Sequence, residues 1–380
     1  MSDTFTFKAL PQERVHFGAS VREALSAEVE RAGAQRVFLA TSRTLRRETA
    51  AVSLVAGTLG KRCAAIFDGI SEHAGLDTVF AALQEARRVD ADLLVGFGGG
   101  SIIDGLKIVQ MGLACQAQAV EQLMQARATP AQLKSAPRQV AIPTTLSGAE
   151  TTPAGGGTDK ARGIKSIFAA EPLVPVSIIY DPALGALTPE WLWLSSALRG
   201  VDHCCEGLLS PRANALADAG LLHALRLFSV ALRRTKSVPG DPFARSQSQV
   251  AAWLACTGSF QAGSGASHGI GYILGGRYGV HHGDTSCIML PHVLRWNETV
   301  TAGRQALICE AMGRSNMRAG DAVAELVHDL GLPARLRDVG IRHEDLPRIA
   351  TEAAGHPVVR ANPRRIEGPD DVMEILEAAW

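Results

Sequence analysis

The sequence predicts an α/β domain, with a parallel sheet covered by helices on both faces, followed by an all-helical domain. The chain has 380 residues, a length that suits two domains. In its first half, short β-rich runs alternate with helical patterns, which is typical of a parallel sheet. From about Thr188 onward the periodicity is helical throughout. We therefore expect an α/β domain over residues 1–184 and a helical domain over residues 185–380, with a hinge between Pro182 and Pro189.

The strands expected in the first half are short β-rich runs. They are VHFG (15–18), RVFLAT (36–41), CAAIFDG (63–69), DLLVGF (92–97), QVAIPTT (139–145) and VSIIYDP (176–182), with GIKSIFAA (163–170) as a shorter strand-like piece. Helical patterns cover 20–32, an Arg-rich stretch from 43 to about 57, 76–88, and a segment that opens at 101. Ligands of such sheets bind at the carboxyl ends of the strands, so the turns there are the candidate binding loops.

The most informative of these turns is Gly98-Gly99-Gly100-Ser101, between the strand DLLVGF and the helix SIIDGLKIVQMGLA. Glycines let backbone N–H groups approach a pyrophosphate, and the start of a helix adds partial positive charge. Ser101 is expected to cap this helix, with Asp104 completing a capping box. A tight turn needs glycine in any case, but the strand and helix on either side favour phosphate or dinucleotide binding, although the spacing GxGxxG is absent.

Two further turns supply polar groups. Thr144, Thr145 and Ser147 follow the run QVAIP, either as hydroxyls that satisfy their own loop or as contacts to a cofactor. Ser42 and Arg43 follow the run RVFLAT, where an acidic residue would normally bind the adenosine ribose. Because no acidic residue stands there and an arginine can pair with a 2′-phosphate, the expected cofactor is NADH or NADPH.

The second half contains helical patterns at 191–210, 213–236, 246–262, 286–299, 304–312 and 321–330, and a last one that ends at 380. Four of the eleven histidines lie in the segment 267–297, namely His268, His281, His282 and His292. No charged residue occurs between Ser246 and Gly276, so His268 lies in a segment suited to burial. A buried imidazole needs a partner on each nitrogen, which is either an ordinary core contact or a ligand. Clustering favours a reaction centre, beside a predicted turn at Gly275, Gly276 and Gly279 that lets a bound molecule approach the backbone.

Composition narrows the class of protein. The net charge is zero, and no basic patch interleaved with aromatic residues occurs, which argues against nucleic-acid binding. The uncharged run at 246–276 is interrupted by Ser, Gln, Thr, Gly and His, so we interpret it as buried in protein and not as a membrane span. The N-terminus has no apolar signal core, and seven cysteines without regular spacing suit reduced thiols. We expect a soluble cytoplasmic protein.

Several motifs together resemble the iron-containing alcohol dehydrogenase superfamily. They are GGGSIIDGLK (98–107), IPTTLSGAE (142–150), YDPAL (180–184), the segment around His203, and SHGIGYILGG followed by HHG. IPTTLSGAE and the C-terminal ANPRRIEGPDDVMEILEAAW are similar to the maleylacetate-reductase branch in particular. The resemblance covers nearly the whole chain, with the motifs in the same order. It implies a homodimeric, cytoplasmic oxidoreductase of aromatic-compound catabolism, with its active site in a cleft between the two domains.

The resemblance also implies roles for individual residues. It assigns the cofactor pyrophosphate to Gly98, Gly99, Gly100 and Ser101, and contacts on the nicotinamide side to Thr144, Thr145 and Ser147. Asp104, Lys107 and Lys165 match positions that the family keeps polar around the cofactor. The implied reaction is hydride transfer from NADH or NADPH to a carbonyl or conjugated keto-acid carbon, with the proton supplied by Tyr272, His268 or His281.

The metal site of the family is only partly matched. Metal-dependent members have an Asp one helical turn before a first His, and two further histidines. The histidines match His203, His268 and His282, but the Asp position falls on Arg199, and the usual extra histidine is Tyr272. A permanently charged guanidinium repels a divalent cation. Asp202 is a poor replacement ligand, because its side chain is expected about 100° around the helix from that of His203.

We therefore expect a metal-free site in which Arg199 and the three histidines form a cationic pocket for a carboxylate or oxyanion of a small acidic substrate. Another interpretation of Arg199 is an ion pair with Asp202 or Glu206. The alternative function is a metal-dependent (iron or zinc) alcohol dehydrogenase that uses His203, His268 and His282, since three imidazoles make a credible zinc site. A lyase or a degenerate binding protein on the same scaffold is the alternative from another class.

Overall fold

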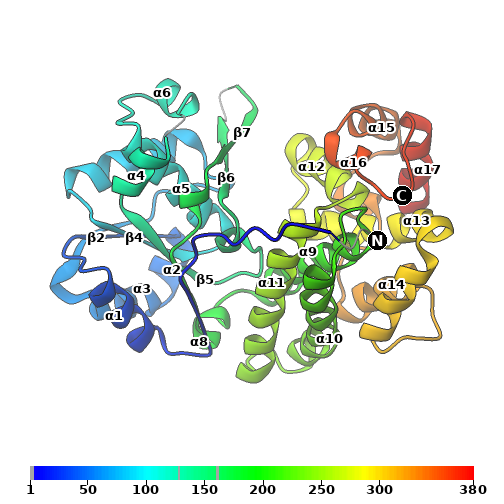
Figure 1. Cartoon of the computed structure of the whole chain (residues 1–380), viewed down its shortest axis with the longest axis horizontal. Coiled ribbons are helices and arrows are strands. Elements are labelled where there is room, and N and C mark those ends of the chain that lie inside the picture. The colour runs from blue at the N-terminus through cyan, green and yellow to red at the C-terminus, as the bar shows by residue number, and fades with distance from the viewer. Residues whose placement is uncertain (1–3, 127–128, 160–161) are drawn as a thin grey trace. The chain divides into compact units, whose positions relative to one another are not determined.

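The computed structural model describes residues 4–126, 129–159 and 162–380 (Figure 1). The chain forms two compact units, one over Ala9–Thr188 and the other over Pro189–Trp380 together with the described residues up to Lys8. Lys8 belongs to the helical unit because its backbone N–H donates to Gln261 Oε1 at 3.1 Å and its carbonyl accepts from Gln261 Nε2 at 2.9 Å. The first unit is α/β, and the second is helical over its described residues.

The centre of the α/β unit is a six-stranded sheet in the order β1-β8-β5-β4-β2-β3. All five pairings are parallel. The six strands predicted for this sheet are all present, as β1 (Arg14–Phe17), β2 (Val37–Thr41), β3 (Cys63–Phe67), β4 (Leu93–Gly98), β5 (Arg138–Pro143) and β8 (Ser177–Tyr180). The fold class predicted from the sequence is thereby confirmed.

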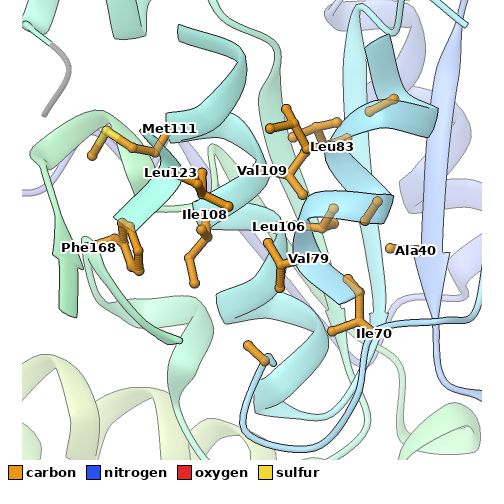
Figure 2. Close-up of a cluster of buried hydrophobic side chains, with 14 of the residues drawn as sticks. Ala40, Ile70, Val79, Leu83, Leu106, Ile108, Val109, Met111, Leu123 and Phe168 are labelled. Atoms are coloured by element: carbon orange, nitrogen blue, oxygen red, sulfur yellow. The ribbon is translucent and has the colours of Figure 1, made fainter. Parts of the chain in front are cut away.

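Alternate side chains of the central strands enter two different cores. In β2, Val37 and Leu39 pack on the face covered by α1 (Val21–Arg31) and α3 (Ala51–Leu59). Phe38 and Ala40 pack on the other face, against α4 (Leu76–Arg88) and α5 (Gly100–Ala114). Figure 2 shows the second core, in which Val79 and Leu83 of α4 lie beside Leu106 and Val109 of α5. Each fully buried side chain of this size contributes about 1.5–3 kcal/mol, so burial on both faces stabilises the sheet strongly.

Two features of the α/β unit were not predicted. The Arg-rich helix is two helices, α2 (Arg43–Glu48) and α3. A separate antiparallel hairpin joins β7 (Ile164–Ala169), which matches the shorter strand predicted from GIKSIFAA, to β6 (Ala154–Asp159), which was not predicted. The glycines of β6 resemble a loop in the sequence, but they allow close packing, since a Cβ on Gly157 would lie 2.6 Å from Leu76 Cδ2. The short helices of the unit are α6 (Val120–Met124), α7 (Pro130–Ser135) and α8 (Pro182–Gly185).

The helices of the second unit are α9 (Glu190–Leu209), α10 (Ala215–Ser237), α11 (Pro242–Ala262), α12 (Ala266–Tyr278), α13 (His282–Ala311), α14 (Ala319–Leu330), α15 (Leu346–Ala354), α16 (Pro357–Arg360) and α17 (Pro369–Ala379). The predicted turn at Gly275 and Gly276 is wrong, because both residues lie within α12, which ends at Tyr278 and has Gly279, with φ of 70°, as its C-cap. The two helices predicted over 286–312 are one helix, α13, with Pro291 inside it. Among the described residues, α10 has the length and composition of a membrane span, and its buried side includes Leu221, Leu225 and Phe228.

Candidate active site

The turn after β4 is built from glycines that leave no room for side chains. Gly98 has φ of 153°, and a Cβ there would lie 2.9 Å from Ile102 Cγ1. A Cβ on Gly99 would lie 3.3 Å from Thr145 Cγ2, and one on Gly100 would lie 2.9 Å from Ser147 Oγ. The glycine turn and the hydroxyl turn after β5 therefore lie against each other. The start of α5 in this turn suits an anionic group.

The sheet topology makes this turn a binding position. From β2 the chain continues to β3 at the edge of the sheet, and it then returns to β4 on the opposite side of β2. Ligands of open parallel sheets bind at the carboxyl ends of strands where the strand order reverses in this way. Ser42 and Arg43 follow β2 at the same edge, but Ser42 Oγ accepts a hydrogen bond from Leu45 N and caps α2. Arg43, two residues after the end of β2, is exposed and positively charged.

The predicted cap of α5 is wrong, because the N-cap is Gly99 and no side chain caps this helix. Ser101 Oγ accepts instead from the backbone N–H of His73 at 3.0 Å. Asp104 Oδ2 accepts from Gly156 N at 3.1 Å, which ties α5 to β6. Thr144 is also used by the protein, since its N–H donates to Gly98 O and its carbonyl accepts from Thr188.

The two lysines differ in role. Lys107 is fully buried and donates to the backbone carbonyls of Ala149 and Ala154, so it holds the segment after β5 in place. Burial lowers the pKa of Lys107, although Asp104 opposes this effect. Lys165 is exposed on β7, and its Cε would lie 3.0 Å from a Cβ on Gly156. Of these two residues, Lys165 offers the accessible charge.

In the helical unit, α9 and α12 bring two of the predicted histidines together. The ring centroids of His203 and His268 are 4.4 Å apart. His203 Nδ1 forms a hydrogen bond with Ser259 Oγ at 3.0 Å. His268 Nδ1 lies 2.7 Å from Glu206 Oε2 and 3.3 Å from Asp202 Oδ2. His268 Nε2 is buried without a hydrogen-bond partner among the described residues, so the pair presents one imidazole nitrogen that a ligand can satisfy.

The protein environment drives the pKa values of these two imidazoles apart. Burial lowers the pKa of His203 well below its ordinary value, and the charges of His268 and Arg199 lower it further. Burial and Arg199 also act to lower the pKa of His268, but Asp202 and Glu206 outweigh them and raise it. Neighbouring titratable groups with divergent pKa values are typical of acid–base sites. His268 is thus the better candidate for a proton carrier.

Arg199 lies beside this pair. Its side chain is 10% exposed, and its Nη1 donates to Ser286 Oγ at 3.2 Å and lies 3.8 Å from Asp202 Oδ2. The ion pair with Asp202, considered as an alternative from the sequence, is therefore present. The guanidinium carbon of Arg199 lies 5.4 Å from the centroid of the Tyr272 ring.

Tyr272 connects Arg199 to the third predicted histidine. The Tyr272 ring contacts His282 edge-on, with centroids 6.4 Å apart, and its centroid lies 5.6 Å from that of His356. Tyr272 is 40% exposed, so the cluster of Arg199, Tyr272 and His282 is accessible to solvent at Tyr272. A Cβ on Gly275 would lie 2.7 Å from His282 Cε1, so this glycine makes room for His282 and not for a bound molecule.

The other two histidines of the segment have structural surroundings. His281 is the N-cap of α13, where its Nδ1 accepts from Gly283 N at 3.3 Å, and its ring packs edge-on against Trp191. Burial, with the charges of Arg295 and Arg335, lowers the pKa of His292 to about 4. His281 is therefore a weaker candidate for the proton donor than His268.

The donors in this site do not fit a divalent cation well. Asp202, Glu206 and His268 each offer one ligand atom, all within 4.8 Å of one another. However, Asp202 Oδ2 already accepts from the hydroxyls of Ser267 and Ser286. Glu206 accepts from the ring of His268 and from backbone N–H groups. The buried guanidinium of Arg199 already supplies positive charge beside Asp202. It would therefore repel a divalent cation bound by these groups.

Three residues of this group were not predicted as site residues. Asp202 and Glu206 were considered only as partners or replacement ligands, yet they bring negative charge into a pocket expected to be cationic. Asp202 and Glu206 are separated by one helical turn in an otherwise apolar stretch of α9. Two acidic residues on one face of such a helix are visible in the sequence and could have indicated the site. His356, the N-cap of α16, gives no comparable signal.

Comparisons with known proteins agree with this fold. The α/β unit matches the sequence model of iron-containing alcohol dehydrogenase over residues 11–182. The helical unit matches that of the Fe-containing alcohol dehydrogenase family, C-terminal, over residues 195–380. Maleylacetate reductase 1 of Cupriavidus pinatubonensis is 30% identical over 363 residues, which cover 96% of this chain and 93% of that protein.

Two further comparisons extend the match. Lactaldehyde reductase of Escherichia coli K12 is 30% identical, with 97% of this chain and 98% of that protein covered. The crystal structure of maleylacetate reductase from Agrobacterium tumefaciens superimposes with a TM-score of 0.86 at 25% identity, covering 100% of this chain and 99% of that chain. These relatives are reductases, so the lyase or binding-protein alternative is set aside. The chain belongs to the iron-containing alcohol dehydrogenase family and is an oxidoreductase similar to its maleylacetate-reductase branch.

Proposed function

We propose that the chain is a metal-independent reductase that transfers hydride from NADH or NADPH to a carbonyl or conjugated keto-acid carbon, with maleylacetate as the first substrate to test. The similarity to maleylacetate reductases over the whole chain supports this substrate class. The single observation that carries the metal-independent part is the buried guanidinium of Arg199, 3.8 Å from Asp202 Oδ2. A homodimer in the cytoplasm stays a prediction.

On the cofactor side, the proposal rests on the glycine turn. Gly98 to Ser101 would hold the pyrophosphate, because the glycine backbone can be approached closely and α5 begins there. Thr145 and Ser147 lie against this turn and offer hydroxyls to the cofactor. Lys165 and Arg43 are exposed cations that would pair with cofactor phosphates. Because Arg43 can pair with a 2′-phosphate, the site would bind NADPH as well as NADH. When bound, the cofactor supplies the hydride.

On the substrate side, His268 is the proposed proton donor. Its Nε2 lacks a partner among the described residues, and its carboxylate neighbours favour the protonated ring. As hydride reaches the substrate carbon, a proton from Nε2 would neutralise the charge that develops on oxygen. Arg199 and His282, together with His203, would orient an acidic substrate through charge and hydrogen bonds. Tyr272 would donate a hydrogen bond at the exposed side of this group.

The experiment follows NADH and NADPH oxidation in the presence of maleylacetate and a panel of neutral aldehydes. We expect turnover with maleylacetate that persists after treatment with EDTA. Turnover with neutral aldehydes alone, lost on chelation and restored by Fe²⁺ or Zn²⁺, would overturn the proposal in favour of a metal-dependent alcohol dehydrogenase. Lack of turnover with every compound would remove both functions.

A further inference from the structure

We infer that Glu206 is the positioning residue that fixes His268, an inference that rests on the proposed reductase function. Glu206 is 5% exposed, on α9. Its carboxylate accepts from three backbone N–H groups at the start of α12 and from one ring nitrogen. These are Gly265 N at 2.8 Å, Ser267 N at 2.7 Å, His268 N at 3.3 Å and His268 Nδ1 at 2.7 Å.

The first consequence concerns the backbone of His268. The N-cap of α12 is Gly265, which has no side chain to cap the helix. A carboxylate from α9 takes this role, and a negative charge at a helix N-terminus is favourable. A Cβ on Gly265 would lie 3.1 Å from Glu206 Oε1, so glycine leaves the space that the carboxylate needs. Glu206 therefore locks the first turn of α12, which carries His268, to α9.

The second consequence concerns the imidazole ring. A carboxylate accepts hydrogen bonds and donates none, so the contact at 2.7 Å requires a proton on Nδ1 of His268. The hydrogen bond at one ring nitrogen determines whether the other nitrogen carries a proton and in which direction it points. Nε2, buried and without a partner among the described residues, is thus the nitrogen left for substrate. Glu206 holds it in that direction.

Asp202 is a weaker candidate for this role. Its Oδ2 is 3.3 Å from His268 Nδ1, a longer contact than that of Glu206. The same oxygen accepts from Ser267 Oγ at 2.9 Å and Ser286 Oγ at 2.7 Å. Asp202 therefore serves mainly to balance the charge of Arg199, while Glu206 sets the geometry of the ring.

The test is Glu206→Gln, which preserves size but places an amide NH₂ against one of these donors. With maleylacetate we expect kcat to fall about 100-fold, the size of a lost general-acid contribution, while KM for the nicotinamide cofactor changes less than about twofold. The matched control is Asp241→Asn. Asp241 caps α11 by accepting from Ala244 N at 3.0 Å and also pairs with Arg234, so this variant removes a carboxylate charge at a helix N-terminus but should leave kcat unchanged.

A second measurement does not depend on the variant folding. In the wild-type protein labelled with ¹⁵N-histidine, and with His268→Asn to assign the signal, long-range ¹H–¹⁵N spectra should show a protonated Nδ1 for His268. A bare Nδ1 would overturn the inference, as would Glu206→Gln with kcat within threefold of an active wild type. If the wild type oxidises no cofactor with any compound, the proposed function fails, and the spectra still decide whether Glu206 fixes the ring.

Discussion

Replacing Arg199 by methionine tests whether its charge is part of a buried network. Arg199 Nη1 lies 3.8 Å from Asp202 Oδ2, and Asp202 is completely buried. Two unit charges at this distance interact by about 4 kcal/mol at an effective dielectric constant of about 20. Asp202 would keep its hydrogen bonds from Ser267 and Ser286. We therefore expect Arg199→Met to lower the free energy of unfolding by about 2–3 kcal/mol, part of the usual cost of breaking a buried pair.

The assay is urea denaturation followed by far-UV circular dichroism, with kinetics on the same samples. The control is Arg277→Met, because Arg277 pairs with Glu352 at 2.8 Å but is 46% exposed, and such surface pairs contribute less than about 1 kcal/mol. In the active enzyme, Arg199→Met should raise KM for maleylacetate at least about tenfold more than for a neutral aldehyde, a difference of about 1.4 kcal/mol. Equal stability of the two variants, with equal KM changes for both substrates, would refute this reasoning.

Three further predictions concern other parts of the chain. His268→Ala should reduce kcat about 100-fold, yet leave the Kd for NADH measured by fluorescence nearly unchanged; retained turnover would exclude it as the proton donor. Gly100→Val should raise that Kd about tenfold or more, because its Cβ would lie 2.9 Å from a hydroxyl oxygen, whereas Gly57→Ala, with nothing within 4 Å, should not. Although burial acts to raise the pKa of Glu28, hydrogen bonds led by Arg31 lower it below 4.5. The stability that Glu28 contributes is therefore complete above pH 4.5 and lost as the pH falls through its folded pKa, and Glu28→Gln should flatten acid unfolding curves in that range.

Much of the α/β unit could be predicted because its strands are apolar runs bounded by turn residues. The helix α4 has the bounds predicted from its pattern, Leu76–Arg88. The hairpin of β6 and β7 could not be predicted in full, since the glycines of β6 are selected by packing against α4 and α5 and not by strand propensity. The continuity of α13 was likewise hidden, because Pro291 usually ends a helix.

The candidate site was predictable as a set of residue types but not as a network. The resemblance to the family indicated His203, His268 and His282, and it indicated that Arg199 stands where metal-dependent members have an Asp. Which partner each side chain chooses depends on contacts between helices far apart in the sequence, such as Glu206 of α9 with His268 of α12. The cap of α5 shows the same limit, because Ser101 binds His73 N of another segment and leaves Gly99 as the N-cap.

The most direct test of the central claim is the metal content of protein purified without chelator, measured by inductively coupled plasma mass spectrometry on active samples. If Arg199 replaces the metal, iron and zinc together should stay well below about 0.1 equivalent per chain while the protein turns over maleylacetate. About one equivalent of iron or zinc, lost together with activity on chelation and restored with it, would contradict the account.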